Sequence, residues 1–332
     1  MIGKYILRRI LQIIPILFAI SILIFCVIQL PPGDYLTTYI ENLKRSGGTV
    51  TEQEIQRLRI QYNLDKSMPE QYLHWIGGII TKGDFGFSFE WNKPVAEVIG
   101  PRIGLTIGIS LLSTAVTWLI AFPIGVYVAT HQYSLGDYVA TILGFIGMSI
   151  PGFLLAMILL FVVFVNSGEL LIGLYASEYL TQGMSWAKFC SAIPRMAMAV
   201  LILGLSSTAG MVRQTRALVL DELEKQYVIT ARAKGISERR VLFKYPIRMA
   251  LNPTISTIGW MLPGMISGET IISIVLNMPT VGPVMKNALM AQDMWLAGSF
   301  LLIVAVLTVI GTLISDILLA VLDPRIRYGG AD

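Results

Sequence analysis

A long apolar run near the start of the chain is the feature that most constrains how it folds. Residues Ile10–Leu30 include no charged side chain, and their number matches the roughly 20 residues that an α-helix needs to cross the ~30 Å hydrocarbon core of a bilayer. Lys4, Arg8 and Arg9 precede the run, as in a secretory signal peptide. The apolar core of a signal peptide, however, has only about 7–15 residues and is followed by a small-residue cleavage site. The sequence therefore predicts a first helix that remains in the membrane.

The composition extends this prediction to the whole chain. It is 55% hydrophobic and 14% charged, with a mean hydropathy of +0.68, whereas soluble domains are about 45–50% apolar and about 25% charged. Helices are expected, because an open strand in lipid would leave backbone polar groups unpaired. We predict an all-α membrane protein with six transmembrane helices, at about Ile10–Leu30, Ile103–Ala129, Tyr138–Val165, Ile193–Val212, Asn252–Leu276 and Trp295–Leu322. The spacings Gly104-x-x-x-Gly108 and Gly144-x-x-Gly147 indicate close helix packing.

The distribution of Lys and Arg predicts the orientation. Cytoplasmic loops are enriched in these residues, and the segment Arg213–Arg248 holds nine of them. We therefore expect this segment and both termini in the cytoplasm. Residues 1–30 would comprise the cytoplasmic N-terminus and the first transmembrane helix, and residues 323–332 the cytoplasmic C-terminal tail. Residues 31–102 have eight basic and nine acidic residues and lie outside in this scheme, since long loops translocate largely regardless of charge. The core is then 103–322, with a cytoplasmic loop at 213–249.

The outer stretch is too long for a simple connection and is expected to form a small helical cap of its own. Thr51 followed by Glu54 has the spacing of a helix N-cap and its N3 partner. Residues Gln71–Ile80 have helical spacing, with Trp75 and Ile79 on one face. The run Gly83-Asp84-Phe85-Gly86 predicts a turn.

The sequence also lacks the patterns of several enzyme classes. It has no Gly-x-x-x-x-Gly-Lys-Ser/Thr, no Gly-x-Ser-x-Gly and no His-Glu-x-x-His. His74 and His131 lie far apart, so we predict neither a metal site nor catalytic residues, and no nucleic-acid motif accompanies the basic charge. Cys26 and Cys190 form no spacing pattern; they are expected to be apolar fillers, with a single disulfide left open.

Acidic residues within the spans are rare and are therefore candidates for a transport path. Glu269 is the deepest, and we predict a polar path formed by Glu269, Ser273 and Asn277. Asp316 lies under two turns from the inner end of its span, where either a path or the membrane interface would explain it.

The most charged segment resembles a known family. Lys225–Arg248 carries seven basic residues and one acid, Glu238, and residues 227–242 read YVITARAKGISERRVL. This resembles the cytoplasmic loop, often called the EAA motif, of permeases in ATP-binding-cassette (ABC) importers, in the version of the dipeptide/oligopeptide branch. The general pattern is Glu-Ala-Ala, three residues and Gly; here Ala231 and Gly235 match, while Ile229 and Thr230 depart from it.

Other stretches extend the resemblance over the whole chain and point to the B-type permease subunit, whose outer insertion is long. They are Leu7-Arg8-Arg9, Asn63-Leu64-Asp65-Lys66, Gln71-Tyr72-Leu73, residues 83–88 and residues 322–328.

The resemblance implies the type I permease fold of ABC importers and a location in the cell membrane. It also implies four kinds of partner. These are the lipid bilayer, a second homologous permease, two cytoplasmic ATPase subunits and an extracytoplasmic binding protein. ATP and Mg would be used by the ATPases, with no cofactor bound by this chain. The implied ATPase-coupling residues are Glu224, Tyr227, Thr230, Ala231, Arg232, Lys234 and Gly235.

The residue types in this loop suit that role. We expect a helix over Asp221–Lys234 that ends at Gly235, a second helix capped by Ser237, and Ala231 as the point of nearest approach to the ATPase. The alternative for this basic loop is contact with anionic lipid headgroups.

The substrate class and some wider alternatives stay open at the level of sequence. The resemblance implies peptides, whereas departures at Leu30–Tyr35, Met278–Pro283 and Ser273 resemble members linked to oligosaccharide uptake. A stand-alone channel or a membrane-embedded enzyme is the alternative class of function. The coupling loop disfavours the channel, and the missing catalytic patterns disfavour the enzyme.

Overall fold

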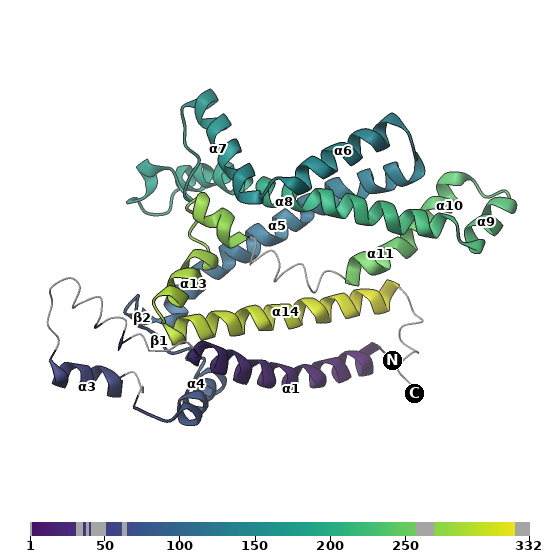
Figure 1. Ribbon diagram of the computed structural model, residues 1–332. Coiled ribbons are helices and arrows are strands. Elements are labelled where there is room, and N and C mark those ends of the chain that lie inside the picture. Colours follow the sequence, from purple (N-terminus) through teal and green to yellow (C-terminus); the bar gives the residue numbers. More distant parts are fainter. Residues whose placement is uncertain are drawn as a thin grey trace. The chain divides into compact units, whose positions relative to one another are not determined.

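The computed structural model describes residues 2–30, 36–37, 40, 51–61, 65–256 and 269–322 (Figure 1). The described part is mostly helical and divides into two compact units. One unit comprises residues 4–105 and 280–309, and the other comprises 1–3, 106–279 and 310–332. Two helices, α5 (Val95–Thr130) and α14 (Met294–Leu322), contribute residues to both units.

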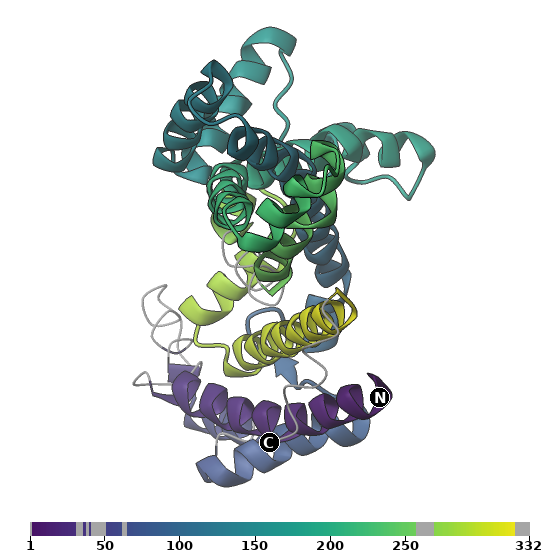
Figure 2. The same cartoon turned by 90° about the vertical axis from the view of Figure 1, so that its right-hand side faces the viewer.

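In the first unit, helix α1 (Ile2–Gln29) lies beside α4 (Met68–Lys82), as both views show (Figures 1 and 2). The Ser21 and Tyr72 hydroxyls lie 2.8 Å apart, and the Gln29 amide donates a hydrogen bond to Gln71 at 3.0 Å. The Phe25 ring packs edge-on against Tyr72. The polar side of α1 therefore faces α4.

The helices of the outer stretch begin near the predicted positions. Helix α3 (Glu52–Gln61) starts directly after Thr51, as predicted, although the side chain of Glu54 lies outside the described residues. Helix α4 starts after Ser67, whose backbone N–H donates to the Glu70 carboxylate at 3.1 Å. Trp75 is buried, on the predicted face. The chain leaves α4 through Gly83, at φ +65°.

A short β-hairpin that the sequence did not predict follows this turn. Strand β1 (Phe87–Ser88) pairs with β2 (Lys93–Pro94) in antiparallel register. The predicted turn at 83–86 is present: Asp84 accepts a hydrogen bond from the Gly86 N–H at 2.9 Å. Strands of two residues are too short to carry an alternating pattern, so they could not be recognised from the sequence. Helix α13 (Val281–Met290) and the first part of α14 also belong to this unit.

The second unit is built around α8 (Trp186–Leu223), against which α6 (Leu135–Ser149), α7 (Gly152–Ser167) and α11 (Pro246–Ser256) pack. The helix predicted over Tyr138–Val165 is not continuous. Helices α6 and α7 are bent by 99° at Ile150–Pro151, where Ile150 is extended (φ −88°, ψ 117°). A residue before proline is pushed out of helical geometry, so Pro151 ends α6 and starts a new helix.

Four described helices are long and apolar enough to cross a membrane, and α6 with α7 would add a fifth if counted as one span. They are Ile6–Gln29, Val95–Thr130, Trp186–Leu223 and Met294–Val321. Most of the predicted span Asn252–Leu276 lies outside the described residues. Along α1, Leu7, Leu11, Ile14 and Phe18 are exposed, which would be a costly apolar stripe in water but suits lipid.

Of the four predicted packing glycines, Gly147 alone meets another described helix: a Cβ added there would lie 3.6 Å from the Cβ of Ala209 on α8, an ordinary contact distance. A Cβ added at Gly104, Gly108 or Gly144 would meet no described atom within 4 Å. At Gly125 it would lie 2.6 Å from the Cβ of Thr215 on α8. The close approach of α5 and α8 at this point therefore depends on Gly125, which was not among the predicted packing glycines.

Candidate functional site

Helix α8 carries the chain beyond the apolar layer. Its 38 residues extend about 57 Å at 1.5 Å per residue, roughly twice the ~30 Å hydrocarbon core. Arg213 therefore does not begin a loop, as the predicted boundary at 213 implied; the helix continues to Leu223. Beyond it lie α9 (Gln226–Ala233) and α10 (Glu238–Lys244), at the far end of α8 in Figure 1. We call residues 224–245 the coupling segment.

The continuous helix predicted over Asp221–Lys234 is wrong, because the chain turns between α8 and α9. Lys225 is extended (φ −70°, ψ 144°) and precedes the first residue of α9. Two contacts brace this turn: the Lys225 ammonium pairs with Asp221 at 3.1 Å, and the Tyr227 hydroxyl donates to the Glu222 carboxylate. The pKa of Tyr227 is raised, mainly because its hydroxyl is partly buried and also because the hydroxyl donates this hydrogen bond.

The end of α9 confirms the predicted role of Gly235 as a helix-terminating residue. Gly235 adopts φ +72°. Its N–H donates to the Arg232 carbonyl at 2.9 Å, and the Ile236 N–H donates to the Ala231 carbonyl at 3.4 Å. This pair of bonds is a Schellman motif. Ser237 precedes α10 as predicted, but its side chain makes no capping hydrogen bond.

The coupling segment has a small core of its own. Val228, Ala231 and Val241 are buried together, and Ile236 and Tyr245 pack against them. The turn before α9 makes this possible, because it directs the apolar face of α9 toward α10. Ala231 is only 4% exposed, so the expectation that it is the point of nearest approach to a partner is corrected: its small side chain fits the segment's interior.

The surface of the segment is formed by the other predicted coupling residues. Glu224, Tyr227, Thr230, Arg232 and Lys234 are exposed. Arg232 is held by a bidentate ion pair with Glu238, at 3.1 and 2.6 Å, which lowers the pKa of the Glu238 carboxyl. Ile229 adds an apolar side chain that is 48% exposed. Exposed Tyr227, Ile229 and Arg232 on a compact segment are suited to protein contact, because aromatic residues and arginine are enriched in protein interfaces.

A second candidate site lies deeper in the same unit, where Glu269 and Ser273 meet α5. Both side chains are buried, and so is Ser110 of α5. The Ser110 hydroxyl donates to one Glu269 oxygen at 3.4 Å, and the Ser273 hydroxyl donates to the other at 3.4 Å. A carboxylate inside a membrane protein needs such polar neighbours. The structure thus brings two of the three predicted path residues together.

The third predicted path residue, Asn277, lies apart from this pair. It is exposed and adopts φ +50°, and its N–H donates to the Ile274 carbonyl at 3.2 Å. The next N–H, of Met278, donates to the Ser273 carbonyl at 2.8 Å. Asn277 therefore ends the helix at 269–275, because asparagine tolerates a left-handed conformation better than most residues.

Ser110 belongs to a polar face of α5 that was not predicted from the sequence. Thr106, Ser110, Ser113 and Thr117 are all buried and follow at steps of four, three and four residues, which place them on one side of a helix. The Thr117 hydroxyl donates to the Gly204 carbonyl of α8 at 3.1 Å. The spacing of these four hydroxyl residues within an otherwise apolar run was the sequence signal that could have revealed this face.

These features together define an integral membrane protein of the transporter class. They are long helices suited to lipid, a buried carboxylate among hydroxyl groups, and a compact polar segment beyond the end of one helix. Residues 121–328 match the family described as binding-protein-dependent transport system inner membrane component, and residues 1–110 match the N-terminal region described for such components. The chain belongs to this family, whose members are the membrane permease subunits of ABC transporters, and it is an integral inner-membrane protein.

Similar proteins cover nearly the whole chain. The oligopeptide transport system permease protein AppB of Bacillus subtilis (strain 168) is 36% identical over 327 residues, 98% of this chain and 100% of that protein. A putative peptide permease protein of Brucella ovis is 31% identical, over 98% of this chain and 99% of its own. The dipeptide transport system permease protein DppB of Escherichia coli (strain K12) is 30% identical, over 98% and 99%.

Proposed function

We propose that this chain is the permease subunit of an ATP-driven importer of short peptides. The observation that carries the proposal is the full-length similarity to relatives whose names describe oligopeptide and dipeptide transport. The oligosaccharide alternative has no such support among these relatives. In this proposal the buried Glu269, Ser110 and Ser273 form part of the polar path through the membrane.

The proposal includes partner subunits. A second homologous permease completes the pore, an extracytoplasmic binding protein delivers the peptide, and two cytoplasmic ATPases bind and hydrolyse ATP with Mg. The coupling segment supports ATPase docking because it is compact and lies beyond the apolar length of α8. In this arrangement Val228, Ala231 and Gly235 set the shape of the segment, while exposed Tyr227 and Ile229 make the contact.

Transport by the reconstituted complex tests the function. The permease pair, the ATPases and the binding protein would be assembled in proteoliposomes, and uptake of a radiolabelled tripeptide compared with that of maltotriose. We expect ATP-dependent uptake of the peptide only. If maltotriose were taken up and the peptide were not, the proposed substrate class would be wrong. If uptake did not require ATP, the proposal of an ATP-driven importer would be wrong.

The orientation has its own test. We propose that residues 31–102 face outward and that the coupling segment and both termini face the cytoplasm. Cys26 and Cys190 are free thiols, so both would first be replaced by serine. A membrane-impermeant maleimide added outside should then label Lys66→Cys and not Glu238→Cys. Labelling of both variants from the same side would refute this orientation.

A further inference from the structure

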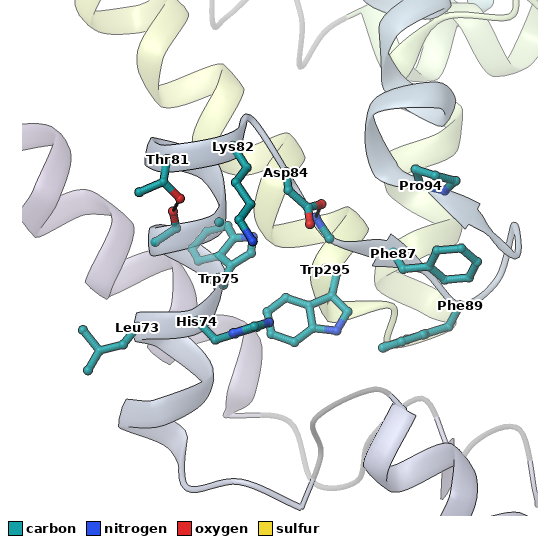
Figure 3. Close-up of a pocket in the computed structure, with 13 residues that line it drawn as sticks. Leu73, His74, Trp75, Thr81, Lys82, Asp84, Phe87, Phe89, Pro94 and Trp295 are labelled. Atoms are coloured by element: carbon teal, nitrogen blue, oxygen red, sulfur yellow. Dashed lines mark hydrogen bonds between the residues drawn. The ribbon is translucent and has the colours of Figure 1, made fainter.

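A pocket of about 590 Å³ lies in the first unit, between α4, the turn after it, the hairpin and the first residues of α14 (Figure 3). Its size is within the range of roughly 300–1,000 Å³ typical of small-molecule sites. Aromatic side chains form much of its lining: Trp75 from α4, Phe87 and Phe89 from the hairpin, and Trp295 from α14. None of the transport features described above uses this pocket.

Hydrogen bonds hold the pocket's walls in place. The Trp75 indole N–H donates to the Ser299 hydroxyl at 3.4 Å, and Ser299 in turn donates to the Phe85 carbonyl at 2.9 Å. On the hairpin side, the Ser88 hydroxyl donates to the Asp293 carboxylate at 2.6 Å. These bonds tie α4, the turn and the hairpin to α14. A ligand would therefore bind without first having to order the loops around it.

Two opposite charges extend into the same hollow. In Figure 3, the side chains of Lys82 and Asp84 both point toward the space beside Trp75 and Trp295. One Asp84 oxygen accepts the Gly86 N–H at 2.9 Å, which fixes the carboxylate and leaves its second oxygen available. Within the described part of the chain, no ion pair joins Lys82 or Asp84 to another residue.

These features suit a ligand that carries both an amine and a carboxylate beside an apolar group. We propose that the pocket binds short peptides, with the Asp84 carboxylate pairing with the peptide's ammonium group and the Lys82 ammonium pairing with its terminal carboxylate. An apolar peptide side chain would pack on the aromatic wall. A neutral oligosaccharide could stack on the same rings, but it would leave both charges without a counter-charge.

This inference rests on the proposed function, because it takes the transported solute and the pocket's ligand to be of one chemical class. It adds a peptide site on the permease itself, in the stretch proposed to face outward. The site would be separate from that of the binding protein and from the buried Glu269.

The test measures peptide binding to the permease pair in lipid nanodiscs, with no binding protein present. The probe is the dipeptide Ala-Phe, followed by calorimetry and by the fluorescence of the pocket tryptophans. We expect saturable binding that weakens about tenfold when either end of the peptide is blocked, by N-acetylation or by C-amidation, since each blocked end loses one charge-assisted contact. This comparison needs no variant of the protein.

Variants then assign each end to one residue. Lys82→Gln should weaken Ala-Phe binding about tenfold and bind the C-amidated peptide no worse than the unchanged protein does. Asp84→Asn should behave in the same way toward the N-acetylated peptide. Lys66→Gln and Asp65→Asn, which alter exposed charges of the same kinds outside the pocket, should bind as the unchanged protein.

Several results would overturn this inference. They are no saturable binding of Ala-Phe, equal binding of blocked and unblocked peptides, or tighter binding of maltotriose than of Ala-Phe. The pocket would instead be a docking surface if the ligand-free binding protein and Ala-Phe competed for binding to the permease pair and blocking the ends of the peptide had no effect. If Ala-Phe does not bind while the full transporter still imports peptides, the inference fails and the proposed function stands. If Ala-Phe binds but no peptide is imported, the proposed function fails.

Discussion

Gly235 offers a sharp test of how the coupling segment is built. It has φ +72°, and a Cβ added there would meet no described atom within 4 Å. Substitution therefore causes no clash, and its whole cost comes from the backbone conformation. For an L-residue with a Cβ, the left-handed region costs roughly 1–2 kcal/mol. Asparagine visits this region more readily than alanine does, so Gly235→Asn should cost less than Gly235→Ala.

The consequence is a change in local opening of the segment. A loss of about 1–2 kcal/mol corresponds to a roughly 5–30-fold larger open population. Hydrogen exchange of the amides in α9 should accelerate by that factor in Gly235→Ala, with a smaller change in Gly235→Asn and little change in the other helices of the unit. Peptide-stimulated ATP hydrolysis by the assembled complex should fall in the same order.

Two outcomes would refute this reasoning. Equal exchange in the alanine and asparagine variants would mean that the left-handed backbone is not the cause of the effect. Faster exchange with undiminished coupled ATP hydrolysis would mean that the shape of the segment does not matter for coupling, and would favour contact with lipid headgroups as its role.

Further predictions concern three other sites in the molecule. Glu269→Gln should lower peptide uptake while leaving assembly with the ATPases intact, as measured by co-purification; normal uptake would make Glu269 a structural residue. Asp293 is fully buried and accepts hydrogen bonds from Ser88 and from two backbone N–H groups, so Asp293→Ala should destabilise its unit by several kcal/mol at about 1–3 kcal/mol per unsatisfied donor. Burial raises the pKa of Asp293. The stability of the unit should therefore fall as pH rises through this raised pKa, because the buried carboxyl must then ionise. Melting temperatures in detergent measured over a pH series should show this fall, and an equal slope of melting temperature against pH in Asp293→Ala would contradict it. Gly125→Ala should overpack the contact with Thr215 and lower stability by about 1–3 kcal/mol, whereas Gly108→Ala, with open space around it, should not; equal melting temperatures for the two variants would argue against the α5–α8 contact.

The sequence alone determined the class of the molecule. Charge-free runs of about 20 residues can only be accommodated as helices in a bilayer, and the described helices lie over four of the predicted runs. The YVITARAKGISERRVL stretch identified the family, because a long local match does not depend on knowing which residues meet in space. The end of α9 at Gly235 was also predictable, since a Schellman motif is a local structure with a preferred residue.

Only the tertiary structure decided which side of each element is used. A membrane helix that is apolar all round carries little periodic signal for its buried face, so the sequence could not distinguish Gly125, which meets Thr215, from Gly104, which has open space around it. For the same reason it could not place Ser110 beside Glu269, 159 residues away along the chain. In the coupling segment, a turn at Lys225 directs Ala231 inward onto Val241. Burial of that small apolar core decides the orientation, and it depends on residues of α10 that no pattern within α9 could reveal.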